Sequence, residues 1–114
     1  MIHCEPGDVL LVRFPFTDLT STKKRPVVVV NSLEYSGRYG DRVVLALTGS
    51  AYEDDFALED WQKAGLIRPS GVKPLIATLA PDVFDKRLGA LSERDRNRVG
   101  GILRRILARE FLSV

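Results

Sequence analysis

Arg25 is the residue of this chain whose type and position are best suited to chemistry on a phosphate. It follows the polar turn STKK and stands with Pro26 at the start of the apolar run VVVV. A guanidinium group is planar and permanently charged, so an arginine held at the mouth of a strand can bind phosphate oxygens through two parallel hydrogen bonds. Taken alone, the pattern equally fits a β-hairpin whose arginine pairs with a surface carboxylate.

The histidine and cysteine content excludes several other chemistries. His3 and Cys4 are the single residues of their types in the chain. One cysteine rules out an intramolecular disulfide and fits a reducing compartment. Two adjacent ligands without a second pair do not make a structural zinc site, and catalysis by paired imidazoles is impossible with one histidine. We therefore expect no structural zinc site, and we predict no cofactor.

Length and composition predict one soluble domain that spans residues 1–114. Hydrophobic residues make up 45% and charged residues 28% of the chain, which is ordinary for a globular protein. The apolar runs, such as 27–30, are far below the roughly 20 residues that a membrane span needs. The N-terminus lacks the basic and apolar regions of a signal peptide, so we expect a cytoplasmic protein.

The net charge of +2 is too small to identify a nucleic-acid partner, but the charges are unevenly placed. Acidic residues gather in residues 53–60, whereas basic residues gather in 23–25 and in 94–109. Such a bipolar surface would steer a polyanion onto one side of the molecule. A solvated surface without a ligand explains the same distribution equally well.

The apolar patterns and the turn residues predict a small, strongly bent antiparallel sheet or barrel, mainly β within the α+β class. Strands are expected at 9–14, 26–31 and 42–48, and one or two short strands are expected at 72–79, which Pro74 interrupts. The polar stretch 31–41 reads as a loop. A short helix is expected at 59–66, with acids in its first turn and Gly65 as its C-cap. A helical turn is expected within 81–87.

A longer helix is expected from residue 93 to about 109. Ser92 and Asp95 have the spacing of a variant capping box. Apolar residues then recur every three or four positions, which predicts one stripe packed against the sheet; they are Val99, Ile102, Leu103, Ile106 and Leu107. The pair Gly100-Gly101 costs the helix roughly 1 kcal/mol per glycine relative to alanine.

Several segments, in order, resemble the MazF/PemK family of toxin ribonucleases. GDVLLVRFPFTDL and KKRPVVVVN resemble the opening strand, its loop and the Arg-Pro entry to the second strand. LALTGS is similar to the third strand, which ends in a small hydroxyl residue. DWQKAGL with PSGVK, and then RLGALSERD, resemble the segments that lead to the C-terminal helix. The similarity runs from residue 7 to about residue 107.

This resemblance implies a fold, an activity and a catalytic pair. The fold is the SH3-like barrel of MazF/CcdB-like toxins, with a short internal helix and a C-terminal helix. The activity is metal-independent cleavage of single-stranded RNA, mRNA included, at short sequence motifs by the toxin of a type II toxin–antitoxin system. Such toxins are usually homodimers neutralised by a cognate antitoxin. The family's catalytic arginine and threonine match Arg25 and Thr48.

A ribonuclease that uses no metal can employ the RNA's own 2′-hydroxyl as nucleophile, which leaves a cyclic phosphate and a 5′-hydroxyl. The protein then has to align the phosphate and stabilise the charge on its oxygens. Arg25 can do so bidentately, and the Thr48 hydroxyl can donate to a nonbridging oxygen. We expect Lys23, Lys24, Ser50 and Lys73 to help bind the substrate. Asp18 is the nearest carboxylate to Arg25 and therefore the possible general base.

Two other functions remain compatible with the sequence. One is a non-enzymatic toxin on the same scaffold that binds a protein target such as DNA gyrase. The other is an RNA-binding module without cleavage, because the loop before Arg25 lacks the acidic residue that many family members carry there. If the chain is a toxin, its antitoxin is expected to be an acidic, partly disordered segment that lies across the basic groove.

Overall fold

Five β-strands form one antiparallel sheet in the computed structural model, which describes residues 4–13 and 23–112. The strands are β1 (Asp8–Arg13), β2 (Lys24–Val29), β3 (Arg42–Thr48), β4 (Gly71–Leu79) and β5 (Phe84–Ala90). Their order across the sheet is β4-β3-β2-β1-β5. Most are rich in valine, leucine or isoleucine, whose side chains pack well on a pleated surface.

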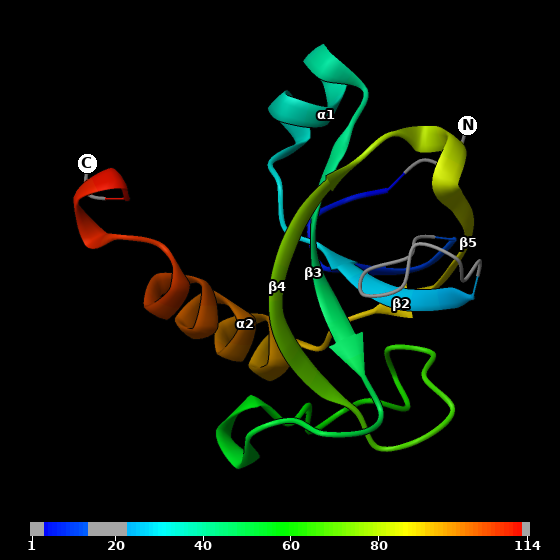
Figure 1. The fold of residues 1–114 in the computed structure, drawn as a ribbon, viewed down its shortest axis with the longest axis vertical. Helices are drawn as coiled ribbons and strands as arrows, with labels where there is room; N and C mark the ends of the chain where they lie inside the picture. The colour runs from blue at the N-terminus through cyan, green and yellow to red at the C-terminus, as the bar shows by residue number, and fades with distance from the viewer. Residues whose placement is uncertain (1–3, 14–22, 113–114) are drawn as a thin grey trace.

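The sheet is strongly curved, and β4 and β5 are its two edges (Figure 1). The register shifts between Leu45 and Leu47 on β3, and twice along β1 where it pairs with β5. Irregularities of this kind bend the strand and increase its twist. The predicted α+β, mainly β fold is therefore confirmed, with the difference that the described strands form an open, barrel-like sheet rather than a closed barrel.

The curved sheet buries two hydrophobic clusters, because alternate side chains of each strand point to opposite faces. On the face covered by the C-terminal helix and by residues 56–66, the buried cluster includes Val28, Leu45, Leu47, Val72, Val99 and Ile102, with Trp61 packed against it. On the concave face, the buried cluster comprises Cys4, Leu10, Val12, Val27, Val29, Val44, Leu79 and Phe84. Both faces of β2 and β3 are thus held rigidly.

The strand predictions are confirmed with small shifts, and that for β3 is correct at both ends. The predicted end of the first strand, residue 14, lies outside the described residues. Of the one or two strands expected at 72–79, the structure has one, β4, which includes Pro74. The expected helical turn within 81–87 is limited to the 3-10 turn η2 (Pro81–Val83), because the chain continues directly into β5.

Residues 31–41 contain a helix and are not the predicted loop. Helix α1 (Leu33–Tyr39) begins at the N-cap Ser32, whose side chain accepts a hydrogen bond from the Tyr35 N–H, and ends at Gly40. Gly40 has a φ of 80°, a left-handed conformation that glycine adopts without a steric penalty. None of the residues of α1 is buried, so the sequence carries no apolar stripe that would have indicated it.

The helix predicted at 59–66 is wrong, since residues 61–65 form hydrogen-bonded turns instead. Gly65 does take the left-handed conformation expected of it, with a φ of 83°. The Glu59 and Asp60 N–H groups, which would have begun a helix, donate to the buried carboxylate of Asp95 at 2.9 and 2.8 Å. The first N–H groups of a helix have no partner within that helix, so the Asp95 carboxylate satisfies two donors at the start of the turns and ties this segment to the C-terminal helix.

The C-terminal helix α2 (Glu93–Ile106) lies across the sheet as predicted, and a short turn, η3 (Arg109–Phe111), follows it (Figure 1). The Ser92 side chain accepts a hydrogen bond from the Asp95 N–H at 3.3 Å, so the N-cap half of the expected capping box forms, while the Asp95 carboxylate accepts from Glu59 and Asp60. Of the predicted stripe, Val99 and Ile102 are buried, but Ile106 and Leu107 are exposed. None of the helices in the described part of the chain is long and apolar enough to cross a membrane.

Candidate active site

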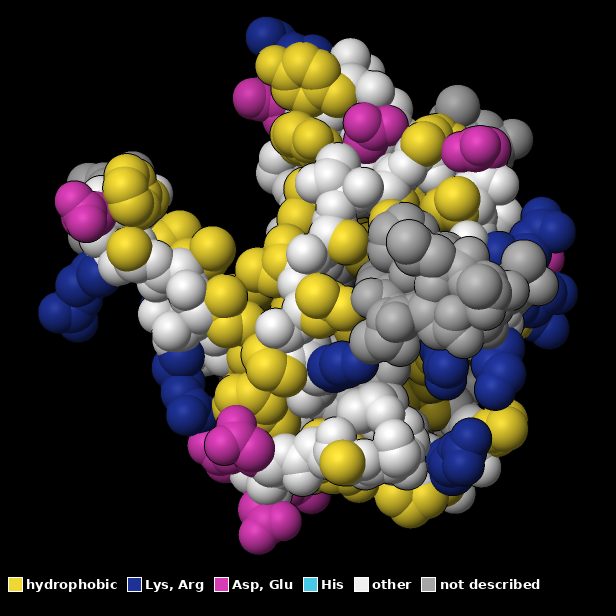
Figure 2. Space-filling model, viewed as in Figure 1, with side chains coloured by type: hydrophobic (Ala, Val, Ile, Leu, Met, Phe, Trp, Pro, Cys, Tyr) yellow, Lys and Arg dark blue, Asp and Glu magenta, His cyan; other side chains and the backbone are white. Residues whose placement is uncertain are grey.

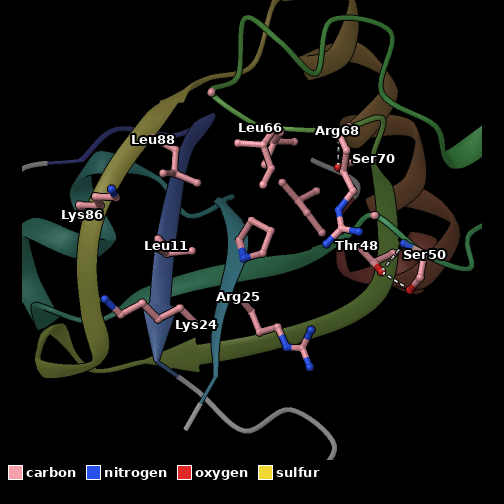
Figure 3. Close-up of a pocket in the computed structure, with 15 residues that line it drawn as sticks. Leu11, Lys24, Arg25, Thr48, Ser50, Leu66, Arg68, Ser70, Lys86 and Leu88 are labelled. Carbon is pink, nitrogen blue, oxygen red and sulfur yellow. Dashed lines mark hydrogen bonds between the residues drawn. The ribbon is translucent and has the colours of Figure 1, made fainter.

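A cavity of about 400 Å³ lies between the sheet and the segment 65–70 (Figure 3). We call it the Arg25–Thr48 pocket. Strands β1, β2, β3 and β5 contribute Leu11, Lys24, Arg25, Pro26, Leu47, Thr48, Lys86 and Leu88; the remaining lining residues are Gly49, Ser50, Gly65, Leu66, Ile67, Arg68 and Ser70. Four of the residues predicted to form a site, Lys24, Arg25, Thr48 and Ser50, are therefore brought together.

The floor of the pocket is a row of residues that crosses four strands. Leu11 pairs with Pro26 on β2 and with Lys86 on β5. Continuing the β2–β3 register by one residue from the Val27–Ala46 pair places Pro26 opposite Leu47. Side chains opposite one another share a face of a sheet, so this row presents three apolar side chains and one lysine to the cavity.

Arg25 and Thr48 lie at the rim of this floor, at the ends of adjacent strands. Two residues beyond the Val27–Ala46 pair, the same register sets Arg25 opposite Thr48. A step of two keeps both on one face, opposite to that of Pro26 and Leu47. In Figure 3 the Arg25 side chain accordingly extends away from the floor residue Leu11. The predicted pair is thus adjacent in the fold.

The side chain of Arg25 is exposed, and no carboxylate of a described residue forms an ion pair with it. Its neighbour Lys24 differs in this respect, because the Lys24 Nζ lies 3.1 Å from the Asp85 carboxylate. The explanation of Arg25 as half of a surface ion pair therefore finds no support in the described part of the structure. Its guanidinium is available to a ligand.

The hydroxyl of Thr48 is oriented by Ser50. The Thr48 Oγ1 lies 3.0 Å from the Ser50 Oγ and accepts a hydrogen bond from the Ser50 N–H at 3.2 Å. An oxygen that already accepts a backbone N–H keeps its own proton to donate. The turn after β3 therefore holds Thr48 in a position where it can act as a hydrogen-bond donor.

The pocket is cationic. Lys24, Arg25, Arg68 and Lys86 line it, and the described residues that line it include neither aspartate nor glutamate. Figure 2 shows Lys and Arg side chains gathered on the side of the molecule where β2 and β5 lie, whereas acidic side chains cluster near η1 (Asp54–Phe56). Such a site attracts an anion and holds it in a cavity partly shielded from water.

Three predicted residues are not among those that line the pocket. Lys73 lies on β4, outside the lining, and Lys23 is exposed beyond the start of β2. Asp18, the possible general base, lies outside the described residues. Among the described residues, no group of three or more His, Cys, Asp or Glu side chains is placed to hold a metal ion. A mechanism without a metal stays a prediction.

Sequence reasoning missed Arg68 and Lys86, which the fold adds to the pocket. Arg68 lies between the helix expected at 59–66 and the strand expected at 72–79, and Lys86 belongs to a strand that was not predicted. One local signal was present. Arg68-Pro69 repeats the Arg-Pro dipeptide of Arg25-Pro26, and an arginine before a proline is biased towards extended backbone.

The arginines of α2 do not join the pocket, because three of them pair with the acidic segment 53–60. Arg94 contacts Asp60 through two hydrogen bonds of 2.7 Å. Arg98 pairs with Glu59 and Arg105 with Asp55. Hydrogen bonds from Arg94 and then Ser92 hold the pKa of the Asp60 carboxyl well below its usual range. Much of the uneven charge seen in the sequence is therefore neutralised by ion pairs within the molecule.

A protein-family model matches residues 5–107 of this chain and describes a PemK-like, MazF-like toxin of a type II toxin–antitoxin system. That match covers nearly the whole chain. The protein belongs to the PemK-like, MazF-like toxin family. The family assignment made from the sequence motifs is confirmed, while a search of curated proteins found no match.

Solved structures with the same fold include several MazF proteins. An endoribonuclease from a mycobacterial species, in complex with its cognate antitoxin, is 18% identical with a TM-score of 0.72, over 91% of this chain and 94% of that chain. MazF from Deinococcus radiodurans is 20% identical with a TM-score of 0.68, over 90% and 94%. Mycobacterium tuberculosis toxin MazF-mt6 is 14% identical with a TM-score of 0.69, over 87% and 94%. At such identities the likeness establishes the fold.

Proposed function

We propose that this toxin is an endoribonuclease that cleaves single-stranded RNA, including mRNA, at short sequence motifs without a metal. The observation that carries the proposal is that Arg25 of β2 and Thr48 of β3, which are adjacent strands, line the same cationic pocket. Arg25 has no carboxylate partner among the described residues, so its charge is available for a phosphate. The solved relatives described as endoribonucleases support the same activity.

In the proposed reaction, the 2′-oxygen of one nucleotide attacks the adjacent phosphorus in line with the departing 5′-oxygen. The bond from the 2′-oxygen to phosphorus forms and the bond to the 5′-oxygen breaks, which yields a 2′,3′-cyclic phosphate and a 5′-hydroxyl. A base accepts the 2′-hydroxyl proton, and the 5′-oxygen gains a proton. Asp18 remains the candidate for that base.

Arg25 and Thr48 act on the phosphate oxygens during this step. The guanidinium of Arg25 donates two hydrogen bonds and balances the negative charge that builds up in the transition state. The Thr48 hydroxyl, held by Ser50, donates a hydrogen bond to a nonbridging oxygen. Lys24 and Ser50 line the same cavity and bind the flanking substrate. Lys23 and Lys73 bind the RNA backbone farther from the pocket.

We further propose that the protein is inhibited by a cognate antitoxin, forms a homodimer and works in the cytoplasm. The antitoxin is supported by the mycobacterial endoribonuclease and by the MazE-MazF complexes of Deinococcus radiodurans. A cationic pocket suits an acidic antitoxin segment, which would compete with RNA for the same charges. Light scattering of the purified protein tests the dimer, and co-purification with the product of the adjacent gene tests the antitoxin.

The decisive experiment incubates the purified protein with mixed single-stranded RNA in excess EDTA, beside Arg25→Gln and Arg104→Gln. Arg104 is an exposed residue of α2 outside the pocket, so its variant matches the change in charge. We expect cleavage at a recurring short motif with 5′-hydroxyl ends, lost in Arg25→Gln and kept in Arg104→Gln.

Three other outcomes would lead elsewhere. Intact RNA with a wild-type protein that still poisons cells would exclude the nuclease and direct the search to a protein target such as DNA gyrase. Binding of RNA without product ends would identify an RNA-binding module. Cleavage that survives in Arg25→Gln would remove this arginine from the mechanism.

A further inference from the structure

Arg68 occupies the Arg25–Thr48 pocket without a role in the proposed reaction. Its backbone belongs to the segment 65–70, which forms the wall opposite the sheet, and its side chain is exposed. Neither an ion pair nor a hydrogen bond joins its guanidinium to a described residue, whereas the α2 arginines 94, 98 and 105 each contact a carboxylate. An uncompensated guanidinium beside a cavity is a binding group for an anion.

The wall that carries Arg68 is fixed at several points. The Leu58 N–H donates to the Ser70 carbonyl at 2.9 Å, and Ala57 bridges to Gly71, so the excursion 58–70 is closed at its base. The Ser70 hydroxyl donates to the Arg68 carbonyl at 2.9 Å. Gly65 lies directly against the Leu88 backbone. The position of Arg68 beside the pocket is therefore built into the fold.

Gly49 allows the Arg68 side chain to lie next to Thr48. A Cβ built on Gly49 would stand 2.7 Å from the Arg68 Nε and 2.8 Å from its Cδ. The side chain thus runs over the bare backbone of the residue that follows Thr48. In Figure 3 the Arg68 guanidinium lies beside Thr48, whereas the Arg25 side chain starts from β2 and extends away from the pocket floor.

We infer that Arg68 is a second phosphate-binding residue of this site, which holds an RNA phosphate next to the scissile one. Arg25 lies at the rim on one side of Thr48, and Arg68 reaches Thr48 from above the apolar floor. A polynucleotide crossing the pocket presents successive phosphates, so two separate arginines bind two of them. This inference rests on the proposed function, because the phosphate that Arg68 binds belongs to the RNA that the protein is proposed to cleave.

Arg68 is predicted to change the affinity for RNA, whereas Arg25 is predicted to change the rate at which bound RNA is cleaved. A contact to a phosphate that does not react binds the ground state and the transition state equally, so it affects affinity and leaves the rate of bound RNA nearly unchanged. A contact to the reacting phosphate strengthens in the transition state and therefore governs that rate. Affinity and rate must be measured separately.

The test compares Arg68→Gln, Arg68→Lys and the matched control Arg104→Gln with the wild type. The probe for affinity is a single-stranded RNA that spans the mapped cleavage site and carries one 2′-deoxynucleotide there, which prevents cleavage. We expect Arg68→Gln to weaken binding about tenfold and to reduce the slope of log affinity against log salt by about 0.7, the value for one phosphate contact in single-stranded nucleic acid. Arg68→Lys retains the slope, and Arg104→Gln retains affinity and slope.

Single-turnover cleavage at saturating RNA completes the comparison. Arg68→Gln should cleave bound RNA within about threefold of the wild-type rate, since the reacting phosphate keeps its Arg25 contact. Gly49→Ala should also weaken binding, because the added methyl displaces the Arg68 side chain. The double variant Gly49→Ala/Arg68→Gln should bind no more weakly than Arg68→Gln alone, since both changes remove one interaction.

The inference is overturned if Arg68→Gln matches Arg104→Gln in affinity and salt slope while the wild type cuts RNA, and the proposed function then stands. It is also overturned if Arg68→Gln binds normally but cleaves bound RNA at least 100-fold more slowly, which would move Arg68 to the scissile phosphate. A wild-type protein that neither binds nor cuts RNA overturns both the inference about Arg68 and the proposed function. Thermal unfolding of each variant checks that the fold is intact.

Discussion

The buried carboxylate of Asp95 on α2 accepts a hydrogen bond of 2.8 Å from the backbone N–H of Asp60. Its other oxygen accepts the Glu59 N–H at 2.9 Å. Asp95 is fully buried, and these bonds attach the helix to the start of the segment that continues to Arg68. One carboxylate therefore links the packing of α2 to the position of the pocket wall.

Asp95→Asn should lower the free energy of unfolding by about 2 kcal/mol. An amide can accept one of the two N–H groups, but its NH₂ group then faces the other, and a partly buried donor loses its partner. Glu93→Gln is the matched control, since Glu93 is exposed in the same helical turn and its variant removes the same charge. Urea unfolding measures the difference, and equal stabilities of the two variants would contradict the anchoring role.

Asp60 is expected to stay ionised well below the pH at which an ordinary aspartate takes up a proton. Two hydrogen bonds from Arg94, and then one from Ser92, lower its pKa. In Arg94→Gln the main cause is removed, so the pKa of Asp60 should rise towards the usual value of about 4. Carbon NMR of the Asp60 carboxyl as the pH is lowered measures its pKa in the wild type and in Arg94→Gln. An unchanged titration in Arg94→Gln would assign the shift to another group.

The same shift sets the direction of a pH effect on stability. Because the pKa is lower in the folded state, the Asp60–Arg94 pair contributes its full stability at pH values above about 4, the unfolded pKa. That contribution is lost as the pH falls towards the folded pKa. The stability gap between wild type and Arg94→Gln should therefore narrow below pH 4. Arg94 is exposed, so added salt should reduce the gap at neutral pH as well.

Thr48→Val should slow the cleavage of bound RNA about 100-fold, the effect of removing one hydrogen-bond donor to a charged transition state. The substitution keeps the shape of the side chain. Thr48→Ser restores the hydroxyl and should recover most of the rate. Ser50→Ala leaves the Ser50 N–H bonded to Thr48, so it should raise KM and retain most of kcat. A loss in Ser50→Ala as large as in Thr48→Val would make Ser50 the donor instead.

The strands could be predicted because their signals are local. Residues 42–48 form an apolar run, bounded by Asp41 and by Gly49-Ser50, and they match β3 at both ends. Strand β5 was not predicted because its sequence, FDKRLGA, does not alternate apolar and polar residues. This composition is consistent with its position at an edge of the sheet. Helix α1 buries no residue, so its caps Ser32 and Gly40 were its main sequence signals.

The site was predictable in part, for a similar reason. Arg25 and Thr48 end two strands whose pairing follows from the chain order, and the family pattern names both. The position of Arg68 depends on the path of the segment 58–70. The start of that segment is bonded to Asp95, which lies 35 residues beyond Asp60 in the chain. The local signals at Glu59, Asp60 and Gly65 favoured a helix there, but residues 61–65 form turns, and the leading N–H groups bind a carboxylate that is distant in sequence.

Gly101→Ala should stabilise the protein by about 1 kcal/mol, since glycine in the middle of a helix is less favourable than alanine by about that amount. Close packing would have justified the glycine, but a Cβ built on Gly101 meets no atom of the described residues within 4 Å. Urea unfolding measures the gain, with Gly40→Ala as the opposite control, because Gly40 has a φ of 80° and should lose stability. If Gly101→Ala instead lowers the stability or weakens the self-association of the protein, the helix surface around Gly101 contacts another chain.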